Sequence, residues 1–184
     1  MSTGQPREGD RFDWLKKARS RLWSRERHDL RAVRPIPLLV GTFFYTGLSP
    51  IASGTVGSLA AVILYYLFSG LQNPAALGIA CIVVLIAGIW SGGIIERQLG
   101  VQDPGIVVID EVFGQWIALA SLTFAGDWRY IIAAFLFFRL FDIIKLPPAR
   151  YFERRPGGTG IMLDDAVAGI YANIAAHLIM HVLY

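Results

Sequence analysis

The feature that most constrains the fold is an uncharged stretch: from residue 35 to residue 95 the chain contains no Asp, Glu, Lys or Arg. A helix of a soluble protein needs a polar stripe that faces water, and this stretch offers none with a formal charge. The chain is 54% hydrophobic and 17% charged, whereas an average soluble domain has about 45–50% apolar and about 25% charged residues. The sequence therefore predicts a membrane protein and excludes a disordered or fibrous chain.

Five segments are candidate membrane spans, and most of them follow one another closely. They cover residues 55–71, 75–95, 109–125, 130–146 and 163–184. As a helix, the 75–95 segment would be about 32 Å long, enough to cross a hydrocarbon core of about 30 Å. The sequence thus predicts an all-α fold, a polytopic membrane helix bundle with about four to five spans.

A segment rich in small residues precedes the first span. Residues 47–58 contain Gly47, Pro50, Gly54 and Gly57 among Ser and Thr. Glycine and proline at this density interrupt a spanning helix, so we expect a re-entrant Gly/Ser/Thr loop here. Residues 35–184 are then a membrane-embedded domain.

Residues 1–34 form a separate basic segment, with ten basic and five acidic side chains. Phe12, Leu15, Ala18 and Leu22 recur at three- and four-residue spacing among the basic residues, which indicates an amphipathic helix suited to an anionic membrane surface. A solvated tail is an equally good interpretation. Nucleic-acid binding is disfavoured because acidic residues interrupt the basic run.

The positive-inside rule gives the orientation. If the basic segment 1–34 is cytoplasmic, five crossings place the loops at 96–108 and 146–160 on the cytoplasmic side. The second loop carries Arg150, Arg154 and Arg155, as the rule requires. The ends of the spans that meet these loops are therefore predicted to face the cytoplasm.

Five carboxylates gather at these cytoplasmic ends, on three consecutive spans: Asp110, Glu111, Asp142, Asp164 and Asp165. Ionisable groups near the membrane are costly unless they are paired, so their convergence predicts a functional site. Capping of a helix N-terminus is the alternative for Asp164 and Asp165. It fails for Asp142, which comes late in its helix, where a negative charge opposes the helix dipole.

The chemistry of the predicted site follows from its ligand atoms. Carboxylate oxygens without cysteine or a nearby histidine favour Mg²⁺ or Mn²⁺ over zinc. Arg139, Lys145 and Arg150 are near enough in the predicted topology to bind a phosphate. His177 and His181 are spaced for a metal pair but belong to the opposite end, so we interpret them as interfacial side chains. A metal, acids and arginine at a membrane surface favour phosphate chemistry on a lipid head group.

The same residues resemble the phosphatidylglycerophosphatase A family of lipid phosphatases. Four blocks in order carry the resemblance: Ser53-Gly54-Thr55-Val56-Gly57; Asp103-Pro104 with Val108-Ile109-Asp110-Glu111 and Gly114-Gln115; Phe138-Arg139-Leu140-Phe141-Asp142-Ile143-Ile144-Lys145; and Gly157-Gly158-Thr159-Gly160-Ile161-Met162-Leu163-Asp164-Asp165 with Ala168-Gly169. The chain departs from the family pattern at Leu146, where a proline is expected, and at the apolar pair Gly105-Ile106.

The resemblance implies Mg²⁺-dependent hydrolysis of phosphatidylglycerophosphate to phosphatidylglycerol and inorganic phosphate. The enzyme would be a multi-pass protein of a bacterial inner (cytoplasmic) membrane, with a phospholipid substrate and a site facing the cytoplasm. The implied catalytic residues are Asp110, Glu111, Asp142 and Asp165, and Asp164 joins these four as a metal ligand. The implied substrate-binding residues are Arg139, Lys145, Arg150, Ser53 and Thr55.

Two other classes compete with this interpretation. The CDP-alcohol phosphatidyltransferases also place aspartates and Mg²⁺ at the cytoplasmic face, but their signature, an Asp-Gly followed by Ala-Arg and two aspartates four apart, is absent. A small ion- or proton-coupled transporter could use buried carboxylates. Magnesium-dependent release of phosphate from a lipid distinguishes the phosphatase from both.

Overall fold

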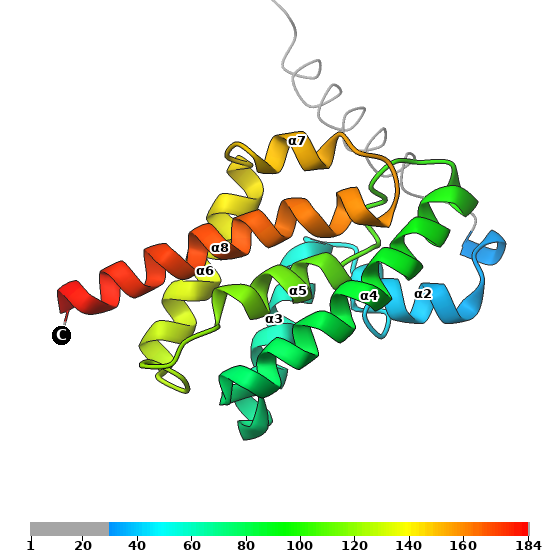
Figure 1. The fold of residues 1–184 in the computed structure, drawn as a ribbon. Coiled ribbons are helices and arrows are strands. Elements are labelled where there is room, and N and C mark those ends of the chain that lie inside the picture. Colours follow the sequence, from blue (N-terminus) through cyan, green and yellow to red (C-terminus); the bar gives the residue numbers. More distant parts are fainter. Residues whose placement is uncertain (1–29, 184) are drawn as a thin grey trace, which may run out of the picture. The chain divides into compact units, whose positions relative to one another are not determined.

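The computed structural model describes residues 30–183, and every regular element in that range is helical (Figure 1). The helices are α2 (Pro35–Gly41), α3 (Ser53–Leu67), α4 (Pro74–Leu99), α5 (Ile109–Ala118), α6 (Trp128–Ile144), α7 (Ala149–Glu153) and α8 (Gly158–Leu183), with 3-10 turns η1 (Leu30–Ala32), η2 (Thr46–Leu48) and η3 (Ser69–Gln72). The all-α prediction is confirmed. Residues 33–183 belong to one compact unit. The predicted basic segment, apart from residues 30–34, lies outside the described residues.

Two helices are long and apolar enough to cross a membrane. They are α4 and α8, with 26 residues each, or about 39 Å at 1.5 Å per residue. Helices α3, α5 and α6 have 15, 10 and 17 residues, fewer than the about 20 that a span needs. The structure therefore supports two of the four to five predicted spans by length and composition.

Helix α5 is shorter than the predicted segment 109–125 because the chain turns after Ala118. The Ser121 hydroxyl oxygen accepts hydrogen bonds from the backbone N–H groups of Thr123 and Phe124, at 3.2 and 2.9 Å. Serine that bonds to nearby backbone N–H groups competes with helix continuation. After this turn the chain continues into α6, so α5 is a short helix of 10 residues.

The predicted small-residue loop is only partly a loop. Its second half, from Ser53 onward, forms the first turns of α3. The first half begins in the 3-10 turn η2 and continues through residues 49–52, where Ala52 adopts the left-handed region with φ of 47°. A Cβ on Gly47 would collide with the carbonyl of Ile106, so glycine lets this loop pack directly on the chain that leads into α5.

Close approach of helices brings α5, α6 and α8 together. A Cβ on Gly169 of α8 would collide with the carbonyl of Gly114 on α5, and one on Gly114 would collide with Phe138 of α6 and with the carbonyl of Asp165. Small residues at such crossings allow the backbones to touch. Because Asp165 borders this crossing, the packing also carries the acidic groups toward one another.

Candidate active site

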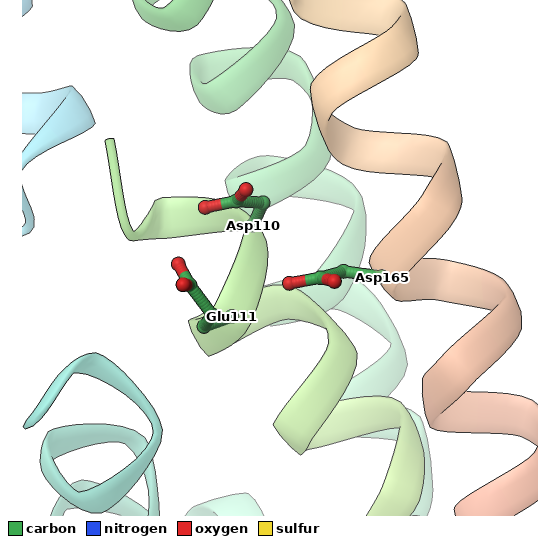
Figure 2. A group of neighbouring side chains, drawn as sticks. All are labelled: Asp110, Glu111 and Asp165. Carbon is green, nitrogen blue, oxygen red and sulfur yellow. The ribbon is translucent and has the colours of Figure 1, made fainter. Parts of the chain in front are cut away.

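Three carboxylates from two helices form the centre of the site. Asp110 and Glu111 lie in the first turn of α5, and Asp165 lies on α8, facing them (Figure 2). One oxygen of each lies within 4.8 Å of the other two. Asp110 and Asp165 are only 7% and 3% exposed. We call this group the acidic trio.

The acidic trio is chemically suited to a divalent cation. Asp110 Oδ1 and Glu111 Oε2 are buried and have no hydrogen-bond partner in the described part of the chain. Buried carboxylates are costly unless they are paired, hydrogen-bonded or bound to a metal. All the ligand atoms are carboxylate oxygens, which Mg²⁺, Mn²⁺ and Ca²⁺ prefer. The trio therefore fits an ion of this class.

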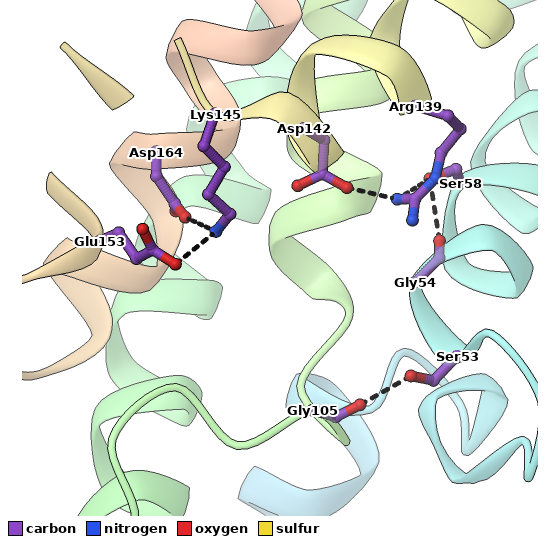
Figure 3. Close-up of polar contacts among 9 residues, drawn as sticks. All are labelled: Ser53, Gly54, Ser58, Gly105, Arg139, Asp142, Lys145, Glu153 and Asp164. Atoms are coloured by element: carbon purple, nitrogen blue, oxygen red, sulfur yellow. Dashed lines mark hydrogen bonds and ion pairs between the residues drawn. The ribbon is translucent and has the colours of Figure 1, made fainter. Parts of the chain in front are cut away.

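Asp142, a fourth predicted ligand, is held in an ion pair. Arg139 Nη1 lies 2.8 Å from Asp142 Oδ2, three residues further along α6. The same Nη1 donates to the Ser58 hydroxyl at 3.3 Å, and that hydroxyl donates to the carbonyl of Gly54 at 2.9 Å (Figure 3). Asp142 is also an electrostatic neighbour of Asp165. The Arg139–Asp142 pair thus lies beside the trio and ties α6 to α3.

Asp164, the fifth predicted ligand, is paired with a lysine. Lys145 Nζ donates to Asp164 Oδ2 at 2.6 Å and lies 3.5 Å from Glu153 Oε1 (Figure 3). Asp164 is 3% exposed, whereas the Lys145 side chain is 22% exposed, so the contact is buried on the Asp164 side. The predicted set of five ligands therefore divides into the acidic trio and two carboxylates that already have a cation.

The N-terminus of α3 meets the site at Gly54. A Cβ on Gly54 would collide with the Glu111 carboxylate and would lie 3.3 Å from Arg139 Nη1. Ser53, predicted to bind substrate, donates its hydroxyl to the carbonyl of Gly105 at 2.8 Å (Figure 3). Thr55 lies in the same turn of α3. Glycine at position 54 thus leaves room for the start of this helix to border the trio.

Arg150, the remaining predicted substrate-binding residue, lies on α7 and is exposed. Its Nη2 donates to the carbonyl of Ile144 at 3.4 Å. Within residues 30–183 it makes no hydrogen bond or ion pair with the acidic trio, so its predicted role rests on its position in the segment that follows Lys145.

Three further acids at this end were not in the predicted set. Glu153 shares Lys145 with Asp164. Glu96, at the end of α4, accepts from the backbone N–H of Gly157 at 2.7 Å through Oε1, and its buried Oε2 has no partner among the described residues. Although Asp103 is an exposed residue, desolvation of its carboxyl group raises its pKa, and Lys145 opposes that rise. A charged residue that ends a long apolar helix is the one signal that could have identified Glu96.

The two histidines lie at the other end of the bundle. His177 Nε2 is 3.0 Å from the Ser121 hydroxyl, and His177 Nδ1 is 2.9 Å from the carbonyl of Asn173. His181 Nδ1 lies 2.9 Å from the carbonyl of His177. Both ring nitrogens of His177 are thus engaged, which agrees with a structural role rather than a metal pair.

Comparison with known proteins identifies the family. Residues 39–180 match the sequence model of phosphatidylglycerophosphatase A. The chain belongs to the phosphatidylglycerophosphatase A family. Two relatives named phosphatidylglycerophosphatase A are 39% identical over 78% of the chain (Escherichia coli, 83% of the relative) and 40% identical over 81% (Haemophilus influenzae, 91% of the relative).

A third relative, from Bacteroides thetaiotaomicron, is provisionally named a phosphatidylinositol-3-phosphatase. It is 43% identical over 76% of this chain and 90% of the relative. No solved structure matches the chain significantly. The matched region contains the acidic trio and both ion pairs, and it begins after the basic N-terminal segment.

Proposed function

We propose that this protein hydrolyses phosphatidylglycerophosphate to phosphatidylglycerol and inorganic phosphate at a bacterial cytoplasmic membrane. The observation that carries the proposal is the buried acidic trio flanked by the Arg139–Asp142 and Lys145–Asp164 pairs. Family membership supports the phosphatase class. Nothing in the described structure favours the transporter alternative.

We assign Mg²⁺ binding to Asp110, Glu111 and Asp165. Their all-oxygen ligand set, and the two buried oxygens without a partner, support this assignment. When bound, such an ion neutralises phosphate charge and lowers the pKa of a water molecule. Asp142 and Asp164 are then neighbours of the metal centre, each held by its own cation.

The phosphate would lie between the acidic trio and the start of α3. The first backbone N–H groups of a helix have no partner within it and favour anions. In α3 these belong to Ser53, Gly54 and Thr55, and the Arg139 guanidinium is beside Gly54. Arg139 can therefore hold equatorial phosphate oxygens while the backbone of α3 binds others. Lys145 supplies a second positive charge from the other side.

A proton must leave the attacking water, and we assign its removal to Asp142. Arg139 fixes this carboxylate at 2.8 Å, and Asp165 is its electrostatic neighbour. A general base must lie within hydrogen-bond reach of the water it activates, and the place of Asp142 beside the trio supports this role. Asp142 is therefore distinct from the acidic trio in this proposal, because it acts on the water rather than holding the ion.

The depth of the site suits a lipid head group. Asp165 comes seven residues after Gly158, the first residue of α8, or about 10 Å along the helix. If α8 spans the membrane, its about 39 Å exceed a hydrocarbon core of about 30 Å, so Asp165 lies near the edge of that core. Lipid phosphates lie at that edge. We propose a multi-pass arrangement with this edge facing the cytoplasm, where the basic loop between α6 and α8 also lies.

A second substrate has specific support. The Bacteroides thetaiotaomicron relative is named for a phosphatidylinositol 3-phosphate activity. Both lipids present a phosphate monoester on a head group, which is the chemistry that the site recognises in our proposal. The two substrates therefore need to be compared directly.

The test is phosphate release by the purified full chain from micelles of either lipid, beside a soluble phosphate monoester. We expect release from phosphatidylglycerophosphate that stops on chelation and returns with Mg²⁺. Asp165→Asn should abolish release and weaken Mn²⁺ binding, measured by electron paramagnetic resonance. Asp127→Asn is the matched control, since Asp127 caps α6 at the other end and asparagine caps equally well.

Two results would overturn the proposal. One is metal-independent release, and the other is no release from any phospholipid monoester when Mg²⁺ is present. Faster release from phosphatidylinositol 3-phosphate would support the phosphatase reaction but identify phosphatidylinositol 3-phosphate as the better substrate.

A further inference from the structure

The short segment between α6 and α8 presents an ordered cationic surface outside the acidic trio. Tyr151, Arg154 and Arg155 are all exposed there. The Arg155 guanidinium lies 4.8 Å from the centre of the Tyr151 ring, and its Nη2 donates to the Tyr151 hydroxyl at 2.8 Å. It also lies 5.7 Å from the Phe152 ring. We call Tyr151, Arg154 and Arg155 the α7 surface.

The α7 surface has a fixed place in the fold. The Tyr171 hydroxyl of α8 donates to the carbonyl of Pro147 at 2.7 Å, and the Gln102 side chain donates to the carbonyl of Glu153 at 3.1 Å. These bonds tie both ends of the segment to neighbouring elements. The segment leads directly into Gly158, where the candidate span α8 begins. On the proposed membrane location, the α7 surface therefore lies at the boundary between lipid and water.

The positive charge of the α7 surface is not cancelled within its own segment. Glu153 is the acidic residue of the segment 145–157, and its carboxylate is paired with Lys145 at 3.5 Å. Lys145 itself binds Asp164, in the site. The Glu153 carboxylate is thus paired with Lys145 at the site. The exposed guanidinium groups of Arg154 and Arg155 can therefore bind an external anion.

Tyrosine and arginine side by side are suited to a lipid interface. Tyrosine is enriched where hydrocarbon meets water, because its ring is apolar and its hydroxyl is polar. Arginine attracts the phosphates of anionic lipids. Exposed apolar side chains continue the surface toward the membrane, with Ile143 73% and Ile144 44% exposed at the end of α6.

We propose that the α7 surface binds the phosphodiester groups of anionic phospholipids, as a lipid site separate from the acidic trio. This inference rests on the membrane location in the proposed function, but not on the hydrolysis. Phosphatidylglycerol and phosphatidylglycerophosphate both carry the phosphodiester without a neighbouring cation such as the choline group of phosphatidylcholine, so either lipid can supply the ligand. A surface that collects anionic lipid beside the site also raises the local concentration of an anionic lipid substrate.

The experiment measures lipid binding to the full chain in non-ionic detergent. A chelator is present, so that the acidic trio holds no ion. Fluorescent phosphatidylglycerol is titrated by anisotropy, with unlabelled phosphatidylcholine, phosphatidylglycerol or phosphatidylglycerophosphate as competitor. We expect the protein to prefer both anionic lipids over phosphatidylcholine. Arg154→Gln with Arg155→Gln should reduce that preference by about 30-fold, since each arginine near an anionic surface contributes about fivefold.

Two comparisons keep the result specific. Arg129→Gln is the matched control, because Arg129 also lies over an aromatic ring, Trp128, at 5.4 Å, but at the other end of α6. It should leave the preference unchanged. Arg154→Lys with Arg155→Lys should keep most of it, because the charge remains.

Several outcomes would refute the α7 surface. The double glutamine variant could keep the preference for anionic lipids, or Arg129→Gln could lose as much of that preference as the double variant does. Much stronger competition by phosphatidylglycerophosphate than by phosphatidylglycerol would show that the terminal monoester is the main ligand instead. The double glutamine variant should still release phosphate at saturating substrate. Lipid binding and phosphate release are therefore measured separately, and either proposal can fail without the other.

Discussion

Removing the ammonium group of Lys145 should destabilise the protein strongly. Asp164 is 3% exposed, and its Oδ2 lies 2.6 Å from Lys145 Nζ. In Lys145→Met, the unbranched chain is kept as far as Cε, but the buried carboxylate loses its cation. Breaking a buried pair in this way typically costs about 3–5 kcal/mol. Glu153, whose side chain is 43% exposed, adds little to this cost because water screens it.

The assay is thermal unfolding in detergent, followed by circular dichroism with a chelator present. For a chain of this size about 1 kcal/mol corresponds to about 2–4 °C, so Lys145→Met should lower the midpoint by roughly 6–20 °C. Adding Asp164→Asn removes the unpaired charge, and the double variant should recover a large part of the loss. Lys145→Arg, which keeps a cation, should cost much less. If the losses of Lys145→Met and Asp164→Asn simply add in the double variant, the two groups are not coupled and the argument fails.

Two further substitutions test the opposite ends of the bundle. Gly54→Ala should lower phosphate release by about 100-fold, because its Cβ would displace the Glu111 carboxylate and a misplaced group in a site lowers the rate by about this factor. The control in the same assay is Gly78→Ala, where a Cβ meets nothing within 4 Å. Normal release by Gly54→Ala would show that the start of α3 does not border the reacting phosphate. Tyr130→Phe should lower the free energy of unfolding by about 1–2 kcal/mol through loss of hydroxyl hydrogen bonds, including the one from Asn173 at 3.0 Å. Phosphate release should stay unchanged. A large loss of activity without unfolding would show that this end of the bundle does affect the site.

The long helices could be predicted from the sequence because composition alone defines them. The predicted segment 75–95 lies inside α4, and residues 163–183 of the last segment lie inside α8, which begins five residues earlier, at Gly158. Asn73 caps α4 by accepting hydrogen bonds from the N–H groups of Ala75 and Ala76, and the helix begins at Pro74, one residue before the predicted start. Helix α5 could not be predicted in the same way, since its end depends on the Ser121 turn. A hydropathy pattern does not register a single hydroxyl that bonds to backbone N–H groups.

The residue types of the site were also predictable, but their pairing was not. Arg139, Asp142 and Lys145 follow one another at three-residue steps, which predicts one stripe along a helix. The first two do pair, at 2.8 Å. However, α6 ends at Ile144, and Lys145 adopts a left-handed conformation with φ of 49°. The helix end therefore directs Lys145 away from Asp142 and toward Asp164 on α8, which periodicity within one helix cannot foresee.

The charges of the site make the binding of phosphate depend on the binding of a metal ion. The acidic trio with Asp142 and Asp164 carries five formal negative charges, while Arg139 and Lys145 carry two positive ones. A phosphate dianion approaching this set alone would meet net repulsion, because both cations are already shared with carboxylates. A divalent cation held by the trio would supply two positive charges against that excess, and the remaining N–H groups of Arg139 could then face the phosphate. Buried Arg139 Nε, which has no partner among the described residues, is one such donor. Chelation is therefore a sharper test of the phosphatase than any single substitution, because it restores the repulsion without altering a side chain.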